Sequence, residues 1–267
     1  MKVYDCFSFN DENELLEIRL NYLNNIVDYF VIIECKYTHQ GTTKGQRIDL
    51  SILEKFKDKI KYFYLEEKIK SNNSWEIESW QRSQISRGLK DCNPEDLIIV
   101  SDSDEIPNLK KISLSNIKNE VYAFQQILLM YKLNLMTKRK WIGSKICRFS
   151  TLKSPQWLRQ LKVHKKYSFL RLDKIFSKTY YKNFKIINDG GWHFGWLKSA
   201  EKIIEKVQSY AHTEHNIPKF KDKSYILECL KTNINFLNGQ EKLEKLEDKF
   251  LPDYIQANFM KYRKWLI

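Results

Sequence analysis

Cysteine is scarce in this chain, which has five among its 267 residues. The five are scattered, and no two form a CxxC pair: Cys6, Cys35, Cys92, Cys147 and Cys229. Zinc knots need closely spaced cysteines, and disulfide frameworks of small secreted proteins use paired ones. The sequence therefore disfavours both and indicates reduced thiols in a cytoplasm.

Long apolar runs are also missing. No stretch approaches the roughly 20 apolar residues that a membrane-spanning helix needs. Residues 1–10 lack the basic and then apolar layout of a signal peptide, and instead predict a first strand. We therefore expect a cytoplasmic protein without a transmembrane segment.

Acidic residues are outnumbered, 33 against 46 Lys and Arg, which leaves a net charge of +13. An excess of basic over acidic residues can attract nucleic acid, anionic lipid or anionic substrates. Here the lysines are spread along the whole chain together with frequent Asn and Ile, as expected of AT-rich coding, and no nucleic-acid-binding motif is present. A nucleic-acid-binding protein is the non-enzyme alternative and predicts tight, salt-sensitive binding. We expect no nucleic-acid partner.

Strand and helix patterns alternate in the first half of the chain. Strands are expected at 3–9, 29–35, 59–65 and 97–101, and helices after residue 10, at 48–56 and at 75–89. The continuous apolar runs at 29–35 and 97–101 are typical of strands buried on both faces. Repeated βα units with short loops predict a mostly parallel sheet with right-handed crossovers, flanked by helices.

The second half is less regular. Strands are expected within 121–135, 143–152 and 184–187, and the chain is expected to be helical from 199 to its end. No repeat or low-complexity linker divides the sequence. We therefore predict one Rossmann-like α/β catalytic domain over 1–215, with a helical C-terminal extension over 216–267 packed on it.

The segment LIIVSDSDEIP carries the clearest chemical signal. A buried apolar strand ends there in Asp102 and Asp104, and ligands of parallel sheets bind at the carboxyl ends of strands. Strand alternation would place both carboxylates on one side, where they can hold Mn²⁺ or Mg²⁺ and, through it, a diphosphate. The competing interpretation is an acidic turn before Pro107.

Five segments resemble, in order, the motif series of glycosyltransferase family 17, the family of the bisecting N-acetylglucosaminyltransferase. They are DCFSFNDENELLEIRL, VDYFVIIECKYTHQGTTK, WQRSQISRGL, VSDSDEIP and GGWHFGW, and they cover roughly residues 4–215. The resemblance implies a GT-A fold, a UDP-sugar donor (UDP-GlcNAc in the characterised members), a divalent metal and inverting transfer to a glycan or glycoconjugate acceptor. Animal members carry a Golgi membrane anchor, and neither that setting nor their N-glycan acceptor is expected to carry over.

A GT-A-like arrangement assigns donor binding to residues near the ends of the first strands, with a tryptophan to stack on a sugar. The candidates are Phe9, Asn10, Glu34, Thr38, His39, Lys44, Arg82, Ser103 and Trp192. Several have a plainer interpretation: a helix cap at Asn10, a strand-end carboxylate in water at Glu34, a solvated rim lysine at Lys44, and a surface ion pair between Glu78 and Arg82.

His193 is a candidate third metal ligand, because several GT-A enzymes use a late histidine; a buried hydrogen-bonding histidine is the alternative. Inverting transfer needs a carboxylate that takes the proton of the acceptor hydroxyl. Glu214, between two histidines, is preferred over Asp189, which also suits a turn before Gly190.

The runner-up among enzymes is a sugar nucleotidyltransferase, which also joins a parallel sheet to acidic metal ligands. Such enzymes usually carry a glycine-rich loop with Lys or Arg after the first strand. Here that loop reads FNDENE at 9–14, which argues against this alternative.

Overall fold

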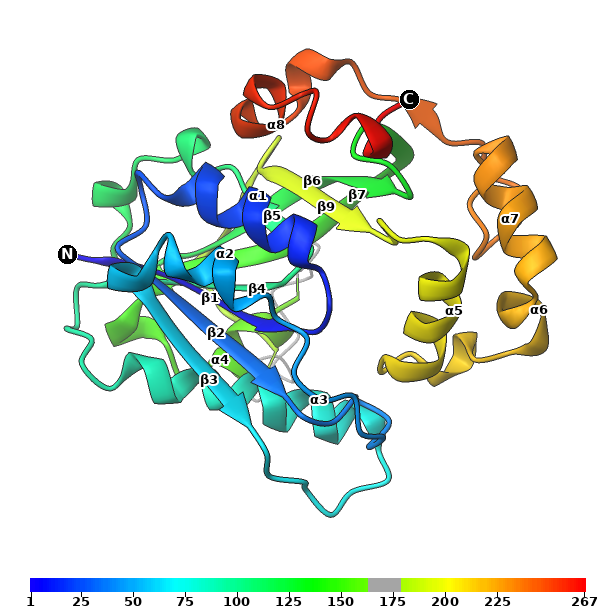
Figure 1. The fold of residues 1–267 in the computed structure, drawn as a ribbon. Coiled ribbons are helices and arrows are strands. Elements are labelled where there is room, and N and C mark those ends of the chain that lie inside the picture. The colour runs from blue at the N-terminus through cyan, green and yellow to red at the C-terminus, as the bar shows by residue number, and fades with distance from the viewer. Residues whose placement is uncertain (163–178) are drawn as a thin grey trace, which may run out of the picture.

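The protein is built around one curled sheet, with helices against it (Figure 1). The structure, a computed structural model, describes residues 1–162 and 179–267. The strands follow the order β3-β2-β1-β4-β7-β6-β9-β5, with β10 on β7 and β8 on β6. Their bounds are β1 Val3–Phe9, β2 Tyr29–Cys35, β3 Ile60–Leu65, β4 Leu97–Asp102, β5 Glu105–Pro107, β6 Val121–Met130, β7 Leu135–Arg148, β8 Phe184–Ile187, β9 Gly191–Gly195 and β10 Glu244–Lys245.

The first four strands are parallel, as the sequence predicts. Phe9 lies beside Glu34, and Ser8 beside Asp102, so β1, β2 and β4 end at the same edge of the sheet. The predicted mostly parallel α/β sheet flanked by helices is thereby confirmed. The apolar runs in β2 and β4 are continuous because both faces of these strands are covered by protein.

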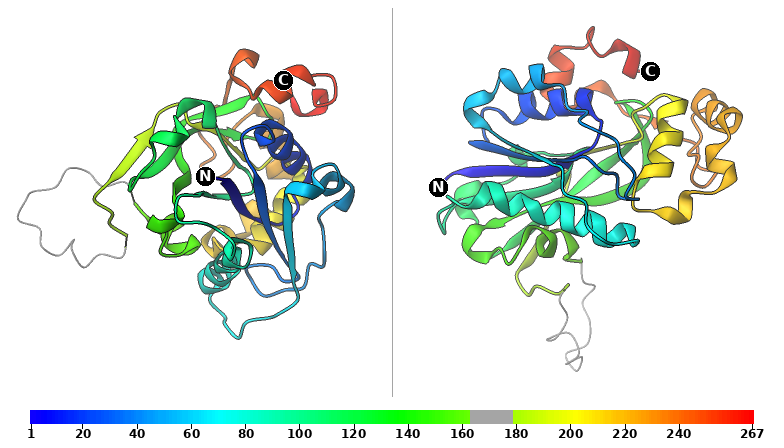
Figure 2. Two further views of the ribbon diagram at one scale, coloured as in Figure 1. Left: turned by 90° about the vertical axis from the view of Figure 1, so that its left-hand side faces the viewer. Right: turned by 60° about the horizontal axis from the view of Figure 1, so that its bottom comes forward.

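Helices cover the two faces of the parallel strands (Figure 2). On one face α1 (Asn13–Leu23) and α2 (Leu50–Glu54) pack on side chains such as Phe7, Phe30 and Ile32. The other face is covered by α3 (Ser74–Ser83), the 3-10 helix η2 (Gln84–Leu89) and α4 (Pro155–Gln160), which pack on the alternate side chains, such as Cys6 and Val31. The helix expected at 75–89 is therefore an α-helix followed by a 3-10 helix.

Beyond β4 the sheet turns antiparallel. The stretch expected at 121–135 is β6, and a tight reversal at Tyr131, which has a φ of 66°, leads into β7. β7 runs antiparallel to both β4 and β6, whereas β9 runs parallel to β6. These pairings bring the second half of the chain against the edge where β4 ends.

The C-terminal part forms an arm beside the sheet (Figure 1). Its helices are α5 (Ala200–Ser209), α6 (Pro218–Lys221), α7 (Lys223–Thr232) and α8 (Asp253–Ala257). α5 and α7 share a third apolar core with Met130 and Tyr131. The helix expected from 199 to the end of the chain is instead divided into these separate helices, and between α7 and α8 the chain pairs with β7 through β10.

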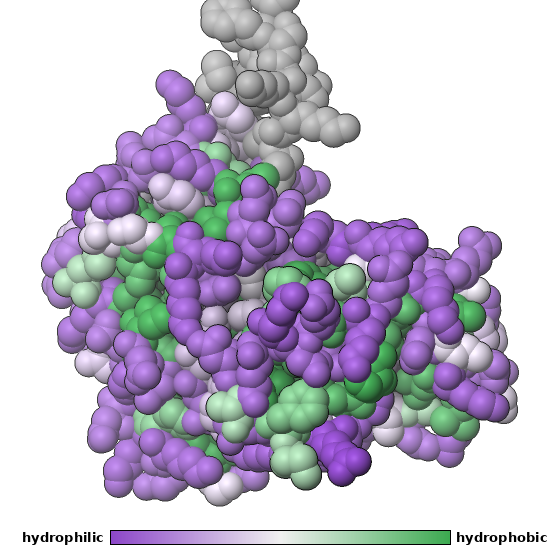
Figure 3. All heavy atoms as spheres, turned by 90° about the horizontal axis from the view of Figure 1, so that it is seen from above, coloured by the Kyte–Doolittle hydropathy of each residue, from purple (hydrophilic) through white to green (hydrophobic). Residues whose placement is uncertain are grey.

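The outer surface is mainly polar on the face seen from above, where hydrophilic residues surround small, separate apolar areas (Figure 3). Across 1–162 and 179–267, no helix has the length and apolar character that crossing a membrane requires.

Candidate functional site

Asp102 and Asp104 lie where β4 ends, at the edge that β1 and β2 share. A turn begins at Ser103 and leads into β5. The two aspartates were expected to share one side of a strand, but only Asp102 belongs to β4. Asp104 lies in the turn and therefore contacts different partners. The two carboxylates form the centres of two adjoining clusters.

Two arginines clamp Asp102. Arg82 of α3 approaches one carboxylate oxygen at 3.1 Å, and Arg159 of α4 approaches the other at 2.5 Å. Partial burial raises the pKa of Asp102, but Arg159 and Arg82 outweigh it and hold the pKa below its usual range. The predicted partner Arg82 is thus at the site, where it also contacts Glu78. The carboxylate remains 37% exposed and faces the site.

Glu105 joins this cluster from beneath, with no exposed surface. Its carboxylate accepts hydrogen bonds from Arg159 at 2.7 Å, from the Trp141 indole N–H at 2.6 Å and from the Asp102 amide at 3.2 Å. Sequence reasoning missed Glu105, Arg159 and Trp141. The signal for Glu105 is its place inside the DSDEIP motif; Arg159 and Trp141 arrive from distant segments.

Asp104 lies against His193 and Lys206. One carboxylate oxygen is 3.5 Å from His193 Nε2, and the other is 3.1 Å from the Lys206 ammonium. The pairing of β5 with β9 sets His193 beside Glu105. Burial raises the pKa of Asp104, but Lys206 and then His193 outweigh it and bring the pKa to about 2. Asp104 is therefore ionised at neutral pH.

The donor set at Asp104 suits a cation that arrives with a diphosphate. Within the described ranges, no three His, Cys, Asp or Glu side chains converge as a metal cage. Magnesium-like cations are commonly held by one or two carboxylates together with substrate phosphates and water. Asp104 provides one such carboxylate, and His193 places its Nε2 beside it, while the buried Nδ1 of His193 has no hydrogen-bond partner. These two residues would hold the metal. Asp102, the other predicted ligand, lies in the adjoining cluster, where its oxygens contact arginines as those of Asp104 contact Lys206 and His193.

The loop after β1 supplies two further carboxylates. Glu12 accepts a hydrogen bond from Ser103 Oγ at 3.0 Å and contacts the ammonium groups of Lys206 at 3.3 Å and Lys198 at 3.6 Å. Asp11 pairs with Lys198. Ser103 is one of the residues predicted for donor binding, and Glu12 holds it in this network. The lysines come from the segment around α5, which this network ties to the loop.

The residues predicted on β2 and its loop are placed close to this edge. Glu34 is buried and accepts hydrogen bonds from the Arg47 amide at 2.6 Å and from Tyr62 at 2.7 Å. Lys44 donates to the carbonyl of Asn10 at 3.0 Å. The side chains of Glu34 and Lys44 are therefore both held by contacts within the protein.

Thr38 and His39 follow in the same loop. The hydroxyl of Thr38 contacts that of Thr42 at 2.7 Å. Burial lowers the pKa of His39, and Glu78 and Arg82 act on it in opposite directions. His39 therefore lies in the electrostatic field of the Asp102 cluster.

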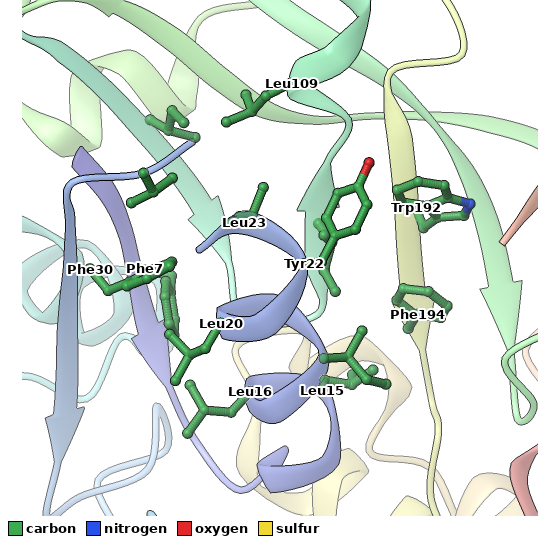
Figure 4. Packing of buried hydrophobic residues seen from close by; sticks show 14 of the residues in the cluster. Phe7, Leu15, Leu16, Leu20, Tyr22, Leu23, Phe30, Leu109, Trp192 and Phe194 are labelled. Carbon is green, nitrogen blue, oxygen red and sulfur yellow. The ribbon is translucent and has the colours of Figure 1, made fainter. Parts of the chain in front are cut away.

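Two predicted donor-binding residues belong to the core. Trp192 is 6% exposed, its ring meets Tyr22 edge to face with centroids 5.3 Å apart, and its N–H donates to the carbonyl of Phe250 at 2.8 Å (Figure 4). Phe9 is 3% exposed and packs in the same cluster. The burial of Trp192 disfavours a sugar-stacking role, because its ring faces other side chains.

The two candidate bases are exposed, Asp189 on a turn and Glu214 in the 3-10 helix η7 (Thr213–His215). Glu214 is 58% exposed and its carboxylate contacts His212 Nδ1 at 2.6 Å. Asp189 is 70% exposed, has a φ of 49° and lies 4.0 Å from the Lys140 ammonium. These contacts do not join either carboxylate to Asp102 or Asp104.

Arg19 of α1 supports the turn between Asp102 and Glu105 from below. It forms a fully buried bidentate pair with Asp5, at 2.6 Å for both hydrogen bonds. It also donates to the carbonyls of Asp102 at 3.1 Å and Glu105 at 2.7 Å. The guanidinium carbon lies 4.2 Å from the ring centre of Phe7. Arg19 thus links α1, β1 and the backbone that carries the acidic motif.

Comparisons with known proteins give a family match over most of the chain. The family model for glycosyltransferase family 17 matches residues 1–250. Beta-1,4-mannosyl-glycoprotein 4-beta-N-acetylglucosaminyltransferases from Rattus norvegicus and Mus musculus are each 20% identical over 291 residues, which cover 98% of this chain and 54% of the relative. The Homo sapiens protein is also 20% identical, over 290 residues. The chain spans about half the length of these relatives.

Solved structures show only distant likeness. HddC from Yersinia pseudotuberculosis, complexed with GMP-PN, matches with a TM-score of 0.37 and 14% identity over 70% of this chain and 90% of that one. A Francisella tularensis 2-C-methyl-D-erythritol 4-phosphate cytidylyltransferase matches with a TM-score of 0.32 and 8% identity over the same shares. TM-scores this low do not establish a shared fold.

Proposed function

Because the chain belongs to glycosyltransferase family 17, we propose that it transfers N-acetylglucosamine from UDP-GlcNAc to a glycan or glycoconjugate acceptor. The observation that carries the proposal is the family match, which includes the DSDE turn and the strand with His193. The relatives' names describe transfer of the same sugar to a mannosyl-glycoprotein. We propose the same sugar and the same reaction for this chain, together with a GT-A-type fold. For the acceptor we propose only that it carries a glycan.

In this proposal, the nucleotide lies at the ends of β1 and β2, near Asn10 and His39. Its diphosphate lies over the end of β4, where Arg82 and Lys206 offer positive charge. Asp104 and His193 would hold a divalent cation, Mn²⁺ or Mg²⁺, which would neutralise charge on the departing UDP. Arg159 and Glu105 keep Asp102 in position beneath the donor.

UDP binding tests the cation and the donor together. Calorimetry with UDP is expected to show clear affinity in Mn²⁺ and a marked loss in EDTA, because the Asp104 carboxylate repels a diphosphate unless a cation lies between them. GDP and CDP in Mn²⁺ are the matched controls for the base and should bind more weakly. Equal UDP affinity with and without metal would contradict the cation, and equal binding of all three nucleotides would contradict the donor.

The proposed transfer is inverting, so a carboxylate must take the proton of the acceptor hydroxyl. We propose Glu214, with Asp189 as the alternative. Both are exposed, so an acceptor can bring its hydroxyl to either of them.

Glu214→Gln is therefore expected to lower turnover with saturating donor and acceptor by about 10²–10⁴-fold, the usual range for losing a general base, and to leave UDP affinity unchanged. Asp189→Asn is the paired variant and should retain turnover. If instead Asp189→Asn loses turnover and Glu214→Gln retains it, Asp189 is the general base. If both variants retain turnover, the base is neither of them.

A further inference from the structure

Trp141 is an exposed tryptophan that is nonetheless held in place. It lies on β7 and is 36% exposed, next to the exposed basic residues 138–140. Its N–H donates to buried Glu105 at 2.6 Å, and its ring centre lies 4.9 Å from that of His193. Glu105 is itself fixed by Arg159. An indole held at its edge and beside a second ring loses little conformational freedom when a ligand covers it.

The site has room for this contact because of one glycine. A Cβ at Gly143 would lie 2.9 Å from the Glu105 carboxylate carbon and 1.9 Å from Gln126 Oε1. Strand alternation places Gly143 on the same side of β7 as Trp141. Without a side chain at 143, Glu105 can reach the indole, and Arg159 donates to the Gly143 carbonyl at 3.0 Å.

Position along the sheet edge indicates what the indole meets. β2, β1, β4 and β7 follow one another in the sheet. β4 pairs with β7 up to Val100 and Lys145, so Trp141 lies beyond that pairing, beside the turn that carries Asp104. A UDP-sugar with its nucleotide at β1 and β2 and its diphosphate at β4 extends its sugar toward β7. This step rests on the proposed function.

We propose that Trp141 is the platform on which the pyranose ring of the UDP-sugar donor stacks. The C–H face of a pyranose is apolar and matches the exposed face of the indole, whose apolar surface is then removed from water. The sugar hydroxyls at the rim of the ring remain free to meet polar neighbours. Trp141 thereby takes the role that the burial of Trp192 disfavours.

The test compares UDP with UDP-GlcNAc by calorimetry in Mn²⁺, because the two ligands differ by the sugar alone. Trp141→Ala is expected to weaken UDP-GlcNAc binding about tenfold, in line with the loss of one aromatic contact, and to leave UDP affinity within about twofold. Trp141→Phe retains a ring and loses the hydrogen bond to Glu105, so it should recover most of the UDP-GlcNAc affinity.

Trp75→Ala is the matched control. Trp75 lies on α3 and is 48% exposed, and its ring centre lies 4.7 Å from that of His212, so its loss should change neither affinity. If Trp141→Ala weakens the binding of both ligands equally, or of neither, Trp141 is not the platform. If that variant does not fold, equal losses of UDP and UDP-GlcNAc affinity in Trp141→Phe contradict the proposal in the same way. A wild-type protein that binds neither ligand overturns the proposed function, and the platform with it.

Discussion

Asp104→Asn is expected to reduce transfer from UDP-GlcNAc by about 10²–10³-fold, the usual effect of removing one group that stabilises developing charge. Asp104 is ionised at neutral pH, since its pKa lies at about 2. The substitution keeps the shape of the side chain and removes the charge that would hold the cation beside His193. The Mn²⁺ concentration for half-maximal activity should rise together with the loss of turnover.

The fold should tolerate this change. Lys206 keeps Glu12 as an anionic partner at 3.3 Å, so no buried ammonium is left unpaired and the melting temperature should stay within a few degrees. Asp253→Asn is the matched control, because Asp253 also pairs with a lysine, Lys110, but at an exposed site. Full activity in Asp104→Asn would mean that the motif is only a turn.

Arg19→Met is expected to have the largest effect on stability, lowering the free energy of unfolding by about 3–5 kcal/mol. The variant leaves the Asp5 carboxylate buried without its partner and takes a donor from the carbonyls of Asp102 and Glu105. Methionine has an unbranched side chain of similar volume, so the loss reports the charge more than the volume. Urea unfolding followed by circular dichroism measures it.

A second variant separates the broken pair from the lost packing. In Asp5→Leu/Arg19→Met no charge remains buried at this position, and well-packed apolar replacements of buried ion pairs are often close to neutral. We therefore expect the double variant to regain most of the lost stability. The exposed pair of Lys36 and Glu66 is the control, where Lys36→Met should cost less than about 1 kcal/mol. A cost of that size for Arg19→Met would contradict the prediction.

Local sequence patterns predicted the parallel half of the sheet. The run at 29–35 coincides with β2, and the run at 97–101 with β4 up to its last residue, because a strand buried on both faces must be apolar throughout. Asp102 and Asp104 stand out for the same reason: charge that follows such a run lies at the sheet edge. His193, inferred by family resemblance, lies beside Asp104.

Chain-distant pairing decided the rest of the site. Arg159, Lys206 and Trp141 reach the acidic turn only because β7 pairs with β4, α4 covers one face and α5 folds back over the loop after β1. None of these contacts has a local signal, because a lysine or arginine at a given position looks the same whether it is solvated or clamps a carboxylate.

The two tryptophans show where sequence information ends. Trp192 and Trp141 both lie on strands of the second half, and their neighbours do not reveal which ring faces water. By itself the sequence determined the βα series, the position of the acidic turn at a strand end and the family. Tertiary structure alone decided that Trp192 packs on Tyr22 while Trp141 stands at the site, because the exposure of a side chain depends on which distant elements cover its face of the sheet.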